Sequence, residues 1–179
     1  MKNILSLFLL FFIATAFTGP ATTPEAEKKV KWYTWEEAVA LQKTAPRKIM
    51  VDIYTDWCHW CKVMDKKTFE EKDIADYLNT HFYPVKLNAE QKADIIYDGN
   101  TFKYVKAGRR GVHTLAYSLL DGKMSYPSIV FLNEKMERVM ISAGFKKPDA
   151  FKTELTYLAE DHYLKQKLNV YQTTSKEGS

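Results

Sequence analysis

The chain has 179 residues, of which 26 are basic and 22 acidic, so its formal net charge is only +4. The basic residues are scattered among acidic ones, a pattern of solvated surface that argues against nucleic-acid binding. The sequence contains only two cysteines, which excludes a framework of several structural disulfides.

The first 16 residues have the pattern of a secretory signal peptide. Lys2 supplies the positive start, Ile4–Ile13 is almost entirely Leu, Ile and Phe, and Ala14-Thr15-Ala16 offers a small-x-small cleavage site. The apolar run is short for a membrane span, although an uncleaved anchor is the alternative. The sequence therefore predicts an extracytoplasmic protein, periplasmic in a Gram-negative source, with no stable membrane insertion after signal cleavage.

The rest of the chain suits one domain. Residues 17–29 are rich in Thr, Pro, Ala and charge and are expected to form a flexible lead-in. Residues 167–179 are polar and are expected to form a frayed tail. Residues 30–166 remain for the folded domain.

Apolar periodicity and turn residues predict alternating strands and helices. In the first half we expect an edge strand over 30–33, a helix from the Thr34–Glu37 capping box to Pro46, a strand over 49–54 and a helical region over 58–81 that breaks near Glu70-Glu71. A strand over 83–88 follows, and then two short strands over 94–97 and 101–105 around an Asp98-Gly99 turn. The last elements are a helix over 114–120, strands over 128–132 and 138–143, and a helix that begins at Pro148. This order predicts an α/β fold with a central mixed β-sheet flanked by helices and a β-hairpin inserted before the third helix.

Both cysteines lie in the run Trp57-Cys58-His59-Trp60-Cys61-Lys62, directly after the buried strand 49–54. This spacing holds two thiols one helical turn apart and is typical of a redox dithiol. Cys58 lies at the helix N-terminus, where unpaired N–H groups favour thiolate, so we expect it to be partly exposed and nucleophilic. Cys61, a turn deeper, is expected to resolve the mixed disulfide. A protonated His59 would stabilise the thiolate further.

Two other interpretations of the cysteine pair stay open. A purely structural disulfide would close a four-residue loop, which gains little entropy. A zinc or copper site would need more ligands, and His81, His113 and His162 are scattered along the chain. The sequence therefore predicts no metal and no cofactor, with a metallochaperone or adaptor module as the alternative function.

Asp52 is a carboxyl in an otherwise apolar strand. If it is buried without a full partner, it is pushed toward the neutral form and can exchange protons with the deeper thiol. An aspartate that reaches water at the strand edge is the equal alternative.

At several of these positions the sequence resembles that of the thioredoxin-like superfamily. The resemblance is strongest to the periplasmic thiol:disulfide interchange domains and to the bacterial thioredoxin-like proteins with a Trp-Cys-His-Trp-Cys motif. Residues 50–58 are similar to the family's Val-Asp-Phe-Trp-Ala-x-Trp-Cys, with Asp52 at its buried acid. Lys86 falls on the strand whose lysine lies near that acid. Tyr126-Pro127 falls where the family has its cis-proline facing the dithiol, and Gly144 also fits.

The resemblance covers roughly Trp32–His162 and implies a thioredoxin fold with thiol–disulfide oxidoreductase activity, as a reductase or in interchange. The catalytic residues that it implies are Cys58, Cys61, Asp52 and Lys86; the substrate-binding residues are Trp57, His59, Trp60, Tyr126 and Pro127. The implied partners are protein disulfide or dithiol clients and an upstream thiol electron donor.

The chain departs from the family at three places. His59-Trp60 replaces Gly-Pro between the cysteines, Tyr126 replaces a smaller residue, and residues 93–112 form an insertion rich in Lys, Arg and Tyr. We expect the insertion to select partners. Its Arg109-Arg110 pair is suited to acidic clients, although a solvated loop is the ordinary explanation of such a pair.

Overall fold

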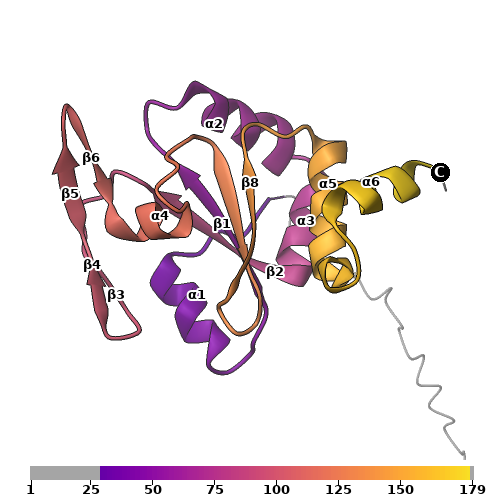
Figure 1. Cartoon of the computed structure of the whole chain (residues 1–179), viewed down its shortest axis with the longest axis horizontal. Coiled ribbons are helices and arrows are strands. Elements are labelled where there is room, and N and C mark those ends of the chain that lie inside the picture. Colours follow the sequence, from indigo (N-terminus) through magenta and orange to yellow (C-terminus); the bar gives the residue numbers. More distant parts are fainter. Residues whose placement is uncertain (1–28, 178–179) are drawn as a thin grey trace, which may run out of the picture.

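The computed structural model describes residues 29–177 and has a four-stranded sheet at its centre (Figure 1). The strands are β1 (Lys48–Tyr54), β2 (Phe82–Asn88), β7 (Ser128–Leu132) and β8 (Arg138–Ala143), in the order β2-β1-β7-β8. β1 runs parallel to β2, whereas β7 is antiparallel to both β1 and β8. The expected mixed sheet is thus confirmed. The expected signal peptide, residues 1–16, lies outside the described residues, as does most of the lead-in.

Helices cover both faces of the sheet. They are α1 (Trp35–Gln42), α2 (His59–Met64), a π-helical turn (Asp65–Phe69), α3 (Lys72–His81), α4 (Thr114–Leu119), α5 (Pro148–Ala159), a 3₁₀ turn (His162–Leu164) and α6 (Leu168–Glu177). One apolar core joins the sheet to α1 and α4, and a second joins it to α2, α3 and α5. Figure 1 shows α1 and α4 on one side of the strands, with α3 and α5 on the other.

Successive side chains of β1 point to opposite faces of the sheet, and this decides against which helices each of them packs. Ile49, Val51 and Ile53 belong to the core beneath α1 and α4, whereas Met50 packs in the core with α2 and α3. Because successive side chains of a strand point to opposite faces, Asp52 lies on the same face as Met50. It therefore lies on the face covered by α2, the helix that carries Cys61.

Local signals placed several element ends correctly. The capping box is present, since the Glu37 backbone N–H donates to Thr34 Oγ1 and the Thr34 N–H donates to the Glu37 carboxylate. The helical region after the cysteines breaks between the π-helical turn and α3, at the expected Glu70-Glu71. The expected edge strand over 30–33 is reduced to one parallel bridge between Tyr33 and Val85.

The insertion differs from the expected single hairpin. The hairpin with the Asp98-Gly99 turn is present as β3 (Ile95–Tyr97) and β4 (Asn100–Phe102), but a second one follows as β5 (Tyr104–Ala107) and β6 (Arg110–His113). The turn between β5 and β6 is Gly108-Arg109, in which only the glycine has positive φ. This dipeptide is not among the common hairpin signals, so the sequence pattern missed it.

The frayed C-terminal tail was also a wrong expectation, because α6 covers Leu168–Glu177. Leu168 and Tyr171 pack against the core formed with α5. The Tyr171 ring lies 5.4 Å from Tyr157 and 4.7 Å from His162, centroid to centroid. Together with Leu168, these ring contacts hold α6 against the domain, although most of the helix's residues are polar. Within residues 29–177, no helix has the length and apolar character needed to cross a bilayer.

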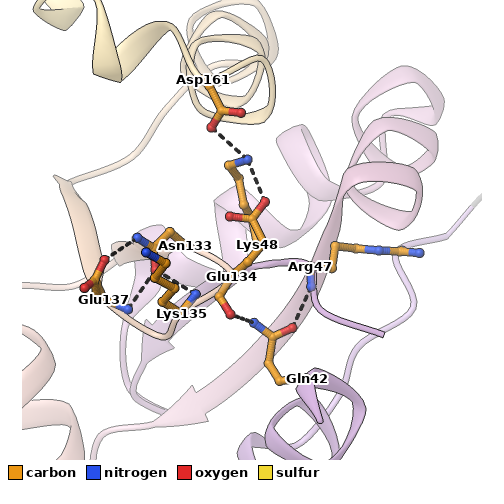
Figure 2. Close-up of polar contacts among 8 residues, drawn as sticks. All are labelled: Gln42, Arg47, Lys48, Asn133, Glu134, Lys135, Glu137 and Asp161. Atoms are coloured by element: carbon orange, nitrogen blue, oxygen red, sulfur yellow. Dashed lines mark hydrogen bonds and ion pairs between the residues drawn. The ribbon is translucent and has the colours of Figure 1, made fainter. Parts of the chain in front are cut away.

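A buried lysine ties together the end of the sheet opposite the cysteines (Figure 2). Lys48, the first residue of β1, has its ammonium 2.8 Å from the Glu134 carboxylate in the β7–β8 turn and 3.0 Å from that of Asp161 after α5. The Gln42 side chain accepts from the Arg47 backbone N–H and donates to the Glu134 carbonyl. One charged cluster therefore links the α1–β1 connection, the β7–β8 turn and the segment after α5.

Candidate redox site

The cysteine pair follows β1 after a three-residue turn. The Cys58 backbone N–H donates to the Thr55 carbonyl at 3.0 Å, which closes this turn. Cys58 is the N-cap of α2, and its sulfur accepts a hydrogen bond from the Cys61 backbone N–H at 3.1 Å. A sulfur in this position receives a donor that would stabilise a thiolate at Cys58 in the reduced protein.

Cys58 and Cys61 form a disulfide, with their Cα atoms 5.3 Å apart. Both residues are buried, at 4% and 3% exposure. The expectation that Cys58 is partly exposed was therefore wrong for this oxidised form. The reason is that the Cys58 sulfur turns into the first turn of α2, where it bonds to Cys61 and faces its N–H.

Two tryptophans next to the cysteines in the sequence, Trp57 before Cys58 and Trp60 before Cys61, are exposed instead. Trp57 is 50% exposed and Trp60 is 55% exposed, values that are unusual for such large apolar side chains. The Trp60 ring lies 5.7 Å from the His59 ring and 5.5 Å from that of Phe145, which follows Gly144 after β8. Sequence analysis did not single out Phe145, because nothing in the chain order indicates that the segment after β8 reaches α2.

Trp57 is the meeting point of three other segments. Its indole N–H donates to the Glu90 carboxylate at 3.1 Å, and its ring lies 5.8 Å from that of Tyr126. The Arg110 guanidinium lies 4.0 Å from the centre of the same ring. The Tyr126–Pro127 peptide bond is cis, and the Pro127 carbonyl accepts from the Gly144 N–H at 2.8 Å. The structure thus brings Tyr126 from the β7 side to the residue that precedes Cys58.

Asp52 and Lys86 lie opposite each other in the parallel β1–β2 register. The Lys86 ammonium is 2.7 Å from Asp52 Oδ2, and Asp52 is only 1% exposed. Burial raises the pKa of Asp52 to about 6, against the opposing effect of the Lys86 charge. The other oxygen, Oδ1, has no hydrogen-bond partner among the residues that the structure describes. A solvated strand-edge aspartate is therefore excluded.

Lys86 is shared with a second acid that sequence analysis missed. Its ammonium also pairs with Asp65, the first residue of the π-helical turn, and it lies 4.8 Å from the centre of the Trp32 ring. Burial alone would lower the pKa of Lys86, but Asp52 and Asp65 outweigh it and raise that pKa. The available signal was the spacing, because Asp65 is four residues after Cys61 and so follows it by one helical turn.

Apart from His59, which lies between the two cysteines, the histidines that the structure describes stay away from the site. Across residues 29–177, no group of three or more His, Cys, Asp or Glu side chains is arranged to hold a metal ion. His113 is fully buried at the start of α4, where it caps the Leu115 N–H and contacts the Ala93 carbonyl. Burial lowers the pKa of His113, so it serves there as a neutral anchor for the insertion.

A closed Cys-x-x-Cys pair at the start of a helix, above a buried carboxyl, is the arrangement expected of a thiol–disulfide exchange site. The family model described as "Thioredox_DsbH: Protein of unknown function, DUF255" matches residues 18–175. The chain belongs to this family. Its fold is thioredoxin-like, and its Cys58–Cys61 pair is of the kind found in disulfide oxidoreductases.

Individual relatives resemble parts of the chain. It is 32% identical over 78 residues to the uncharacterized protein B0495.5 of Caenorhabditis elegans, a match that covers 43% of this chain and 11% of that protein. It is 31% identical over 90 residues to the thiol:disulfide interchange protein DsbD of Pseudoalteromonas atlantica, covering 50% of this chain and 14% of that protein. The chain thus matches only a small part of either relative.

Two solved structures share the fold. A DsbH oxidoreductase superposes with a TM-score of 0.55 at 15% identity, covering 82% of this chain and 94% of that one. A thioredoxin-fold protein from Helicobacter pylori superposes with a TM-score of 0.59 at 14% identity, covering 87% of this chain and 97% of that one. At these identities the likeness concerns the fold alone.

Proposed function

We propose that this protein is an extracytoplasmic thiol–disulfide oxidoreductase that acts on protein disulfides, as a reductase or in interchange. The observation that carries the proposal is the combination of two features: the Cys58 sulfur caps α2, and Asp52 is buried on the sheet face beneath that helix. The likeness of part of the chain to a thiol:disulfide interchange protein supports it.

The reaction begins with the reduced pair. The Cys58 thiolate attacks one sulfur of the client disulfide, so a mixed disulfide forms and the other client sulfur leaves as a thiolate. Cys61 then loses its proton to the Asp52 carboxylate and attacks the Cys58 sulfur. The mixed disulfide breaks, the second client sulfur leaves, and the client has gained two electrons. The Cys58–Cys61 disulfide remains, and an external dithiol donor returns two electrons to it.

The pKa of Asp52 suits this role as base. With a pKa of about 6, the carboxyl is mostly ionised at neutral pH and can accept a proton from the buried thiol. Its unpartnered Oδ1 is the free acceptor, because Oδ2 is engaged by Lys86. The positive charge of Lys86 stabilises the ionised form of Asp52 and so offsets part of the effect of its burial. Both residues thus act in proton transfer, and neither needs to touch the client.

The client is held by the residues around the pair. Exposed Trp57 and Trp60 supply apolar contact next to the disulfide, and His59 lies beside Trp60. Tyr126 packs against Trp57, so the Tyr126-Pro127 segment lies next to the residue that precedes Cys58. An extended client segment would lie along Tyr126-Pro127 with its disulfide over Cys58.

Insulin reduction tests the proposal. The full chain should accelerate the reduction of insulin by dithiothreitol, Cys58→Ser should return the rate to that of dithiothreitol alone, and Cys61→Ser should accumulate mixed disulfides that mass spectrometry detects. If both single variants kept the wild-type rate, the assignment would be wrong. Metal analysis distinguishes this function from the metallochaperone alternative. The chain is purified in its reduced form and without chelator, and a metallochaperone should then carry one bound metal ion per chain.

Location needs its own experiment. Expression of the full chain in a Gram-negative host should yield a periplasmic protein whose N-terminus, determined by mass spectrometry, follows Ala16. Full-length protein in the membrane fraction would instead support the uncleaved anchor.

A further inference from the structure

The β5–β6 hairpin concentrates positive charge beside the redox site. Between Asp98 and Asp121 the sequence has no acidic residue, but it has four basic ones: Lys103, Lys106, Arg109 and Arg110. All four are exposed. In the part of the chain that the structure describes, none of the four forms an ion pair with an acid. Their charge is therefore free to meet a partner.

One face of the hairpin is continuous with the residue before Cys58. Directly opposite residues of an antiparallel pair point to the same face. Arg110 lies opposite Ala107, and Val112 lies opposite Val105, so these four side chains share one face. Arg110 reaches the Trp57 ring from this face, and Val105 is 45% exposed. The face therefore combines small apolar side chains with a cation that already contacts the site.

The base of the hairpin is fixed to the domain while its tip projects. The His113 backbone N–H donates to the Ala89 carbonyl at 2.7 Å, and the Thr114 N–H donates to the Lys103 carbonyl at 2.9 Å. Gly111 is buried beneath the Tyr104 ring, where a Cβ atom would clash with that ring. Figure 1 shows β5 and β6 extending at the edge of the molecule beside α4, far from α5 and α6. A fixed base allows the exposed tip to bind without ordering a loop.

We propose that the β5–β6 hairpin and Trp57 form a docking surface for an acidic segment of the client, next to the disulfide that is exchanged. The proposal rests on the function proposed above. A client disulfide over Cys58 has flanking residues that pass across Trp57, and acidic side chains there meet Arg110 and then Arg109. Opposite charges at such a rim mainly raise the rate of productive encounter.

Two disulfide-containing peptides test this docking surface. They share one sequence except at the residues three to six positions from each cysteine, which are Glu in one peptide and Gln in the other. These positions are chosen because an extended chain advances roughly 3.3 Å per residue, so side chains there can reach past Trp57 to the hairpin. The full reduced chain should react with the acidic peptide about tenfold faster at low salt. The preference should shrink in 0.5 M NaCl, where screening shortens to a few ångströms.

Charge-reversal variants assign the preference to the hairpin. Arg109→Glu/Arg110→Glu should bring the ratio of the two rates to about one. Arg109→Glu alone keeps the Arg110–Trp57 contact and should still reduce the ratio; Lys106 is left unchanged because it points to the opposite face of the hairpin. The control Lys165→Glu/Lys167→Glu changes the net charge as much as the double hairpin variant does, at two exposed positions between α5 and α6, and it should leave the ratio at the wild-type value.

The outcomes separate the two proposals. If wild-type chain reduces both peptides at equal rates, or if either hairpin variant keeps the full preference, the docking surface is refuted while the redox assignment stands. If the control loses the preference as the hairpin variants do, overall charge and not the hairpin explains it, which also refutes the proposal. If the chain reduces neither peptide nor insulin, the redox function itself has failed.

Discussion

Replacing Asp52 by asparagine should stabilise the oxidised protein, and more so as the pH rises. The pKa of this carboxyl is about 6 in the fold against 3.8 for the free side chain, chiefly because it is buried. A pKa that is raised on folding contributes stability that is complete below 3.8 and is lost as the pH rises through about 6. At about 1.36 kcal/mol per pKa unit, this loss amounts to about 3 kcal/mol in the wild type. Asparagine cannot ionise and so avoids it.

The measurement is the free energy of unfolding from urea titrations at several pH values with the disulfide closed. The difference between Asp52→Asn and wild type should grow by about 2 kcal/mol between pH 4 and pH 8, since part of the change already occurs below pH 4. Lys86 keeps its pairing with Asp65 in the variant. Taking the difference at each pH cancels the groups that the two proteins share.

Asp98→Asn is the matched control. Asp98 is exposed in the β3–β4 turn at a φ of 49°, a conformation that asparagine also adopts readily. It should show no comparable growth with pH. A difference for Asp52→Asn that stays constant within about 0.5 kcal/mol from pH 4 to pH 8 would refute the account of a buried, costly carboxylate, since the expected effect is several times larger.

Two further predictions concern the ion pairs of Lys86 and of Lys48. Asp65→Asn should lower the pKa of Asp52 below about 6, because it removes a repelling charge and leaves Asp52 as the one acid paired with Lys86. The ¹³C chemical shift of the Asp52 carboxyl, followed against pH, measures this pKa, and an unchanged midpoint would show that Asp65 has no influence. Lys48→Met should lower the free energy of unfolding by about 0.5–1 kcal/mol, because Glu134 and Asp161 lose their shared ammonium but are themselves nearly half exposed to water, and equal urea midpoints for variant and wild type would contradict this.

Sequence patterns succeeded where one local rule decides the structure. The capping box at Thr34, the break after the π-helical turn and the strands of the central sheet each depend on residues close in sequence or on a simple alternation. The pairing of Asp52 with Lys86 was reached through resemblance, and the parallel register explains it physically, since the two residues lie opposite each other.

The missed features depend on contacts between distant segments. The spacing from Cys61 places Asp65 one helical turn further along, but it does not indicate that Asp65 shares Lys86 with a residue of β1, because that requires the π-helical turn to lie beside β2. The helix α6 is held by Leu168 and by the Tyr171 ring, which lies against Tyr157 and His162, although most of its residues are polar. The burial of Cys58 likewise follows from how its sulfur turns under Cys61, which the spacing of two cysteines does not fix.

The site divides its tasks between two sets of residues on different elements. Asp52 is buried on the sheet face beneath α2, where burial tunes it as a proton acceptor, and Lys86 links it to the more exposed Asp65. Trp57 lies at the surface and collects contacts from Glu90, Arg110 and Tyr126, which come from three separate segments. Because the insertion touches only this second set, its sequence can change without disturbing the proton chemistry. On the functions proposed here, client choice can therefore vary within the family while the exchange chemistry of the dithiol is kept.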